Sequence, residues 1–112
     1  MSPITTHVLD TSQGRPAQGV PVVLESRRVG GRWKTLAKKS TNADGRVADL
    51  FAGAKLPKGV YRLSFNVSRY FRALKKPCFY PEIAVVFEVS DGRHYHVPLL
   101  VSPFGYSTYR GS

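Results

Sequence analysis

Apolar and polar residues alternate with a period of two along most of the chain. The segments VYRLSFNV, IAVVFEV and YHVPLLV each place an apolar residue at every second position, which is the pattern of a half-buried strand. The segments ITTHVLD, VPVVLESRRV and RWKTLAKKST bring the number of expected strands to six or seven. Turn signals such as SQGRPAQG, NADGR, LPKG and SDGR separate them. This order predicts an all-β sandwich or barrel.

One segment, SRYFRALKKP, departs from this alternation. Ser68 is a good N-cap residue, and Tyr70, Phe71 and Leu74 follow at helical spacing before a proline. The pattern predicts one short helix at about Ser68–Lys76.

Length and composition are those of a single globular domain spanning residues 1–112. The chain is 42% hydrophobic and 21% charged, which is typical of a folded soluble protein. No apolar run approaches the roughly 18 residues of a membrane span. The first ten residues lack a basic segment followed by an apolar one, so we expect a cytoplasmic protein without a membrane partner. The single cysteine, Cys78, excludes an internal disulfide framework.

A formal net charge of +10 favours anionic partners. Nucleic acid, an acidic surface and an anionic small molecule are all compatible with it, and so is a merely solvated basic surface.

The three histidines are the main candidates for chemistry. His94 and His96 share one strand face, opposite the apolar residues, and His7 faces outward from its own strand because Val8 faces inward. Neutral imidazole is the usual base near neutral pH. Two strand histidines can also begin a zinc site, but no cysteine or carboxylate stands at ligand spacing, so we expect no metal.

Arg46 and Cys78 are the other candidates. Arg46 directly follows a tight Asp-Gly turn, where its guanidinium would suit a planar anion or amide. Cys78 follows two lysines and a proline, yet no nucleophile motif surrounds it, which favours an unreactive thiol over a catalytic one. The chain has no G-x-S-x-G elbow and no phosphate-binding loop motif.

Several segments together resemble one family. HVLDTSQGRPAQGVPV, TNADGR, GVYRLSF, FYPEIAVVFEV, HYHVPLL and the final YRGS are similar to the transthyretin-related proteins, and more narrowly to the 5-hydroxyisourate hydrolases of urate breakdown. The resemblance runs from about residue 4 to the end. YRGS discriminates most, because the hormone-carrying transthyretins lack it.

The resemblance implies a transthyretin-like β-sandwich of two four-stranded sheets with one short helix. It also implies a homotetramer, a dimer of dimers with active sites at the dimer–dimer interface. By the same resemblance, His7, Arg46, His96 and Ser112 are catalytic, and His7, Arg46 and Tyr109 bind the substrate. The implied reaction is hydrolysis of 5-hydroxyisourate without a metal or other cofactor. The basic helix region departs from the family's usual pattern and affects surface charge.

Two other functions are compatible with parts of the sequence. A transthyretin-like carrier of small aromatic ligands would use the same fold without chemistry. The charge and six tyrosines also suggest a nucleic-acid-binding β-domain, but no aromatic pattern of an RNA-binding module is present. We therefore expect a small-molecule substrate and no nucleic-acid partner.

Overall fold

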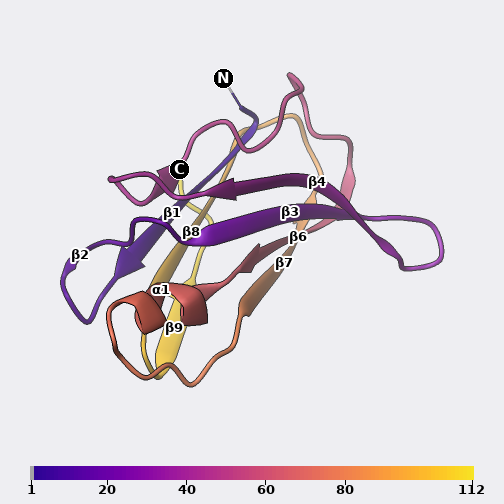
Figure 1. The fold of residues 1–112 in the computed structure, drawn as a ribbon. Helices are drawn as coiled ribbons and strands as arrows, with labels where there is room; N and C mark the ends of the chain where they lie inside the picture. Colours follow the sequence, from indigo (N-terminus) through magenta and orange to yellow (C-terminus); the bar gives the residue numbers. More distant parts are fainter. Residues whose placement is uncertain (1) are drawn as a thin grey trace.

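The computed structural model describes residues 2–112, which form two β-sheets packed face to face and one short helix (Figure 1). In chain order the elements are β1 (Ile4–Asp10), β2 (Arg15–Pro16), β3 (Pro21–Arg27), β4 (Trp33–Ser40), β5 (Arg46–Val47), β6 (Gly59–Phe65), α1 (Val67–Ala73), β7 (Ile83–Val89), β8 (Tyr95–Ser102) and β9 (Gly105–Thr108).

The first sheet has the strand order β2-β1-β8-β9, and β5 also pairs with β1. The second sheet has the order β4-β3-β6-β7. Strands β1 and β8 run parallel, whereas the other pairs are antiparallel. The expected all-β sandwich with one helix is therefore confirmed. The strand number differs from the expected four plus four, because the two-residue strand β2 pairs with β1 in addition to β5.

The core lies between the sheets and follows the alternation of the sequence. In β1, residues 4, 6, 8 and 10 are buried, while the residues between them are half-buried on the outer face. The largest fully buried side chains come from both sheets, the helix and the loop before β6: Phe65, Phe71, Ile4, Leu24, Leu50, Leu63, Ile83 and Leu99. Alternation thus decides which side chains of each strand remain available for binding.

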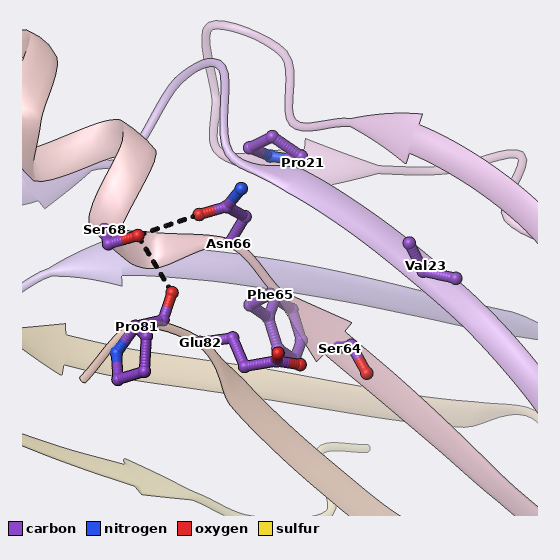
Figure 2. A pocket seen from close by; sticks show the side chains of 8 residues that line it. All are labelled: Pro21, Val23, Ser64, Phe65, Asn66, Ser68, Pro81 and Glu82. Atoms are coloured by element: carbon purple, nitrogen blue, oxygen red, sulfur yellow. Dashed lines mark hydrogen bonds between the residues drawn. The ribbon is translucent and has the colours of Figure 1, made fainter.

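The helix begins earlier than predicted, at Val67, and Asn66 rather than Ser68 is its N-cap. The side chain of Asn66 accepts a hydrogen bond from the backbone N–H of Arg69 at 3.2 Å. The Ser68 hydroxyl instead lies 2.9 Å from the Pro81 carbonyl oxygen and 3.1 Å from the side-chain oxygen of Asn66 (Figure 2). These residues line a hollow of about 360 Å³ beside the second sheet.

The helix also ends earlier than predicted, at Ala73. Lys75 adopts a left-handed backbone conformation with φ of 57°, so the helical path stops before the proline is reached. The phenol of Tyr70 donates a hydrogen bond to Asp10 at 2.8 Å and joins the helix to the end of β1. The helix in the described part of the chain is too short to cross a membrane.

Candidate active site on the outer face of the first sheet

Strands β1 and β8 bring two predicted site residues together. Their parallel pairing sets Thr5 beside His96 and His7 beside Pro98, with all four side chains on the side away from the core. Strands lie about 4.8 Å apart and rise about 3.3 Å per residue. The two histidines are therefore diagonal neighbours, with Cα atoms on the order of 8 Å apart.

Strand β5 adds the arginine to this group, because Arg46 pairs directly with His7. The turn before it is held by Asn42, whose side chain accepts hydrogen bonds from the backbone N–H groups of Asp44 and Arg46 at 2.9 and 3.0 Å. Gly45 has φ of 73°, and a Cβ there would collide with the carbonyl oxygen of Val8 in β1. The NADGR turn thus fixes the backbone position from which the Arg46 side chain extends.

The guanidinium of Arg46 is free to bind a ligand. The ion pairs formed within residues 2–112 join Lys39 to Asp49 and Arg62 to Glu25. No carboxylate of that part of the chain therefore pairs with Arg46.

Both imidazoles are shifted toward their neutral forms. Burial lowers the pKa of His7, and the Arg46 guanidinium lowers it further, while the backbone and carboxylate of Asp44 act in the opposite direction. Burial is also the main cause that lowers the pKa of His96, followed by Arg46, His7 and His94. A cation disfavours a second positive charge nearby, so burial and the Arg46 guanidinium both favour the neutral imidazole, which is the form that can accept a proton.

The end of the chain reaches this face through Gly111. Its backbone N–H donates to the His96 carbonyl at 2.8 Å, in a bridge that continues the β8–β9 register. A Cβ built on Gly111 would lie only 2.5 Å from Cδ2 of the His96 ring. Glycine therefore allows the tail to pack directly against the imidazole.

Tyr109 and Ser112 are less closely tied to the histidines. The continued register sets Tyr109 opposite Pro98, in the same row as His7 and Arg46. Tyr109 is 58% exposed, and Ser112 is exposed as well. Within residues 2–112, no side-chain hydrogen bond joins either residue to the histidines. Their predicted roles stay predictions.

We call the outer surface formed by Thr5, His7, Arg46, His96 and Gly111 the histidine face. Its residues line none of three hollows of about 250–430 Å³ that lie elsewhere on residues 2–112. Beside it lie three apolar side chains on the same outward side, which are buried or half-buried: Leu9, Pro98 and Leu100.

His94 and Cys78 occupy different environments. His94 is exposed, and its Nε2 lies 2.9 Å from the hydroxyl of Thr5. Cys78 is half-buried outside the histidine face, and its thiol donates to the Tyr80 carbonyl at 3.2 Å. Among residues 2–112, no three His, Cys, Asp or Glu side chains are grouped so that they could hold a metal ion.

Comparisons with known proteins show which family the chain is related to. The model of the HIUase/Transthyretin family matches residues 4–111. The chain belongs to this family. A 5-hydroxyisourate hydrolase of Caulobacter vibrioides is 50% identical, and the match covers 100% of both chains. The family resemblance expected from the sequence is thus confirmed.

Two solved structures share the fold. The 5-hydroxyisourate hydrolase of Klebsiella pneumoniae has a TM-score of 0.85 and 39% identity, with 97% of this chain and 92% of that chain covered. Sea bream transthyretin in complex with thyroxine has a TM-score of 0.93 and 31% identity, with 98% of this chain and 95% of that chain covered.

Two residues of the histidine face were not singled out from the sequence, Thr5 and Gly111. Thr5 stands two positions before His7, so alternation alone puts it on the same face. Gly111 lies inside YRGS, but its contact with His96 depends on the β8–β9 register. Only the first of these two could have been found from periodicity.

Proposed function

We propose that the protein hydrolyses 5-hydroxyisourate to 2-oxo-4-hydroxy-4-carboxy-5-ureidoimidazoline, a step of urate degradation, without a metal. The relatives from Caulobacter and Klebsiella that match nearly the whole chain are named 5-hydroxyisourate hydrolases. The observation that carries the proposal is the grouping of two imidazoles and an unpaired guanidinium on one face, where burial and the guanidinium lower the pKa of both rings.

In this reaction His7 and His96 carry the proton transfers. One imidazole takes a proton from water as the water oxygen bonds to the ring carbonyl carbon. The carbon–nitrogen bond then breaks, and the departing nitrogen receives a proton, so that one water is added overall. Arg46 holds the carbonyl and nitrogen edge of the substrate and offsets the negative charge that develops on oxygen.

The tail completes the site in this proposal. Tyr109, in the same row as His7, closes one side of the planar substrate and binds it through its phenol. Ser112, through its hydroxyl or its carboxylate, orients the water or a histidine.

The carrier alternative has weaker support. The thyroxine complex of sea bream transthyretin concerns a chain only 31% identical to this one, whereas the Caulobacter hydrolase is 50% identical. A carrier also has no need of two imidazoles grouped beside a free guanidinium.

The proposed assembly is a homotetramer, a dimer of dimers in which another subunit covers the histidine face. Leu9 and Leu100, which are apolar and only half-buried beside the histidines, favour such a cover. Within residues 2–112, β7 and β9 each pair along one side only, and unpaired edges are ready to pair with another chain. Sedimentation should give a tetramer mass, and a fully active monomer would refute the assembly.

A coupled absorbance assay tests the activity. Urate oxidase generates 5-hydroxyisourate in the cuvette, and its decay is followed with wild-type protein, with His96→Ala and with no protein. The wild type should accelerate decay at least ~100-fold more than the variant, the usual scale for a positioned base. A wild-type rate equal to the protein-free rate would contradict the proposed function.

A further inference from the structure

The hydroxyl of Thr5 lies between two imidazoles. Its Oγ1 is 2.8 Å from Nδ1 of His96 and 2.9 Å from Nε2 of His94. Thr5 and His96 are direct partners in the β1–β8 pairing, so both backbones fix this contact. Of the two ring nitrogens of His96, Nδ1 is therefore the one engaged by β1, and Nε2 is left for a ligand.

Proton counting couples the two rings. A hydroxyl has one proton and can donate to only one of them. If both contacts are hydrogen bonds, at least one ring must donate its own N–H to Thr5. The tautomer of His96 therefore depends on which way the Thr5 hydroxyl points.

The free side of the ring selects the direction. Thr5 occupies the Nδ1 edge of His96, so a lone pair that can take a proton from water must lie on Nε2. A neutral imidazole has one N–H and one lone-pair nitrogen, so a lone pair on Nε2 requires the proton on Nδ1. The Thr5 hydroxyl then accepts from Nδ1–H, and its own proton is left for His94.

We propose that Thr5 is a positioning residue that holds His96 in its Nδ1–H tautomer, so that Nε2 faces the open side as the base for water. The hydrogen bonds then run from His96 Nδ1–H to Thr5 Oγ1, and from the Thr5 hydroxyl to His94 Nε2. This inference rests on the proposed function and adds which histidine takes the proton.

The chain also supports the proton transfer itself. When Nε2 of His96 takes a proton from water, the water oxygen bonds to the substrate carbonyl carbon and the ring becomes an imidazolium. Its Nδ1–H already donates to Thr5, so the new charge meets an oriented acceptor. The proton later passes from Nε2 to the departing nitrogen as the carbon–nitrogen bond breaks, and His96 returns to its neutral form.

Ring ¹⁵N NMR on histidine-labelled protein reads the tautomer directly and needs no substrate. The sequence has three histidines, so there are three pairs of ring ¹⁵N signals, and each pair is assigned from a variant in which one histidine is replaced. At a pH where His96 is neutral, its spectrum should show Nδ1–H. Thr5→Val, which keeps the shape but removes the hydroxyl, should mix the tautomers and lower kcat by ~10–100-fold, as expected for losing an orienting partner.

Two variants serve as controls. Thr5→Ser keeps a hydroxyl and should recover most of the lost rate and the Nδ1–H signal. Thr35→Val makes the same change at an exposed position of β4 in the other sheet and should alter neither readout.

An Nε2–H tautomer of His96 in the wild type would overturn the inference, and so would Thr5→Val with both tautomer and kcat unchanged. A wild-type protein with Nδ1–H His96 but no hydrolysis would refute the proposed function while upholding the tautomer that Thr5 imposes.

Discussion

Replacing Gly111 by alanine should damage catalysis much more than stability. The added Cβ would lie 2.5 Å from Cδ2 and 3.3 Å from Cγ of His96. Carbon atoms in good contact are about 3.5–4.0 Å apart, so the ring or the tail must retreat by about 1 Å. The ring cannot turn away freely, because its Nδ1 lies 2.8 Å from the Thr5 hydroxyl.

A misplacement of about 1 Å at a reacting group costs on the order of 100-fold in rate. We therefore expect Gly111→Ala to lower turnover by about that factor. The backbone of Gly111 does not need a left-handed conformation, and the residue lies at the end of the chain. The free energy of unfolding should therefore change by no more than about 0.5 kcal/mol.

The matched control is Gly105→Ala, in β9. A Cβ there would meet Ser102 Oγ at 3.7 Å, an ordinary contact. Both variants are compared with the wild type in the coupled absorbance assay and in urea unfolding. If Gly111→Ala turns over at the parent rate, the packing of the tail on His96 has no part in catalysis and the reasoning is wrong.

Four further outcomes are expected. Turnover should fall by ~100-fold or more in each of His7→Ala, Arg46→Ala and His96→Ala. It should fall much less in His94→Ala, and a larger loss there than in His96→Ala would show that the site has been assigned to the wrong histidine. Because the Arg46 cation lowers the pKa of both His7 and His96, Arg46→Ala should raise their NMR titration midpoints, and unchanged midpoints would contradict this. Activity should resist EDTA, whereas loss on chelation and recovery with zinc would overturn the metal-free mechanism. Deleting Tyr109–Ser112 should abolish hydrolysis but preserve the circular dichroism spectrum, and a truncated tetramer at near the parent rate would show that the tail is dispensable.

Periodicity predicted the faces of β1, β6, β7 and β8 correctly because each of these strands buries one side. The segments at β1, β6, β7 and β8 alternate clearly and are strands in the structure. Strands β2 and β9 carry no such signal. Their burial patterns contain no buried residue, and within residues 2–112 each pairs with one neighbouring strand only.

The helix start shows a different limit. Asn66 and Ser68 are both good N-cap residues, and local sequence does not choose between them. The backbone N–H of Asn66 donates to the Pro21 carbonyl at 3.0 Å. This contact with β3 fixes where the extended chain ends, and the helix follows directly.

The site could be predicted only in part, because it also depends on contacts between segments that are distant in the sequence. Alternation put His7 and His96 on outward faces, but the parallel pairing of β1 with β8 brings them together. Strand order is a property of the whole sandwich and cannot be read from the period of one segment. The contact of Thr5 with both neighbouring imidazoles was therefore out of reach, although Thr5 itself was on the expected face.

Pro98 explains how the tail can matter to the site while contributing little to the sheet. Backbone groups two residues apart in a strand point to the same neighbour, and His96 accepts from Gly111. The N–H that Pro98 lacks would therefore have faced Tyr109, so the ladder to the tail is interrupted there. The Thr108 hydroxyl donates to the Pro98 carbonyl at 2.7 Å instead. The tail is thus held by few bonds at the point where it contacts His96, which lets changes there alter the position of the imidazole without unfolding the sandwich.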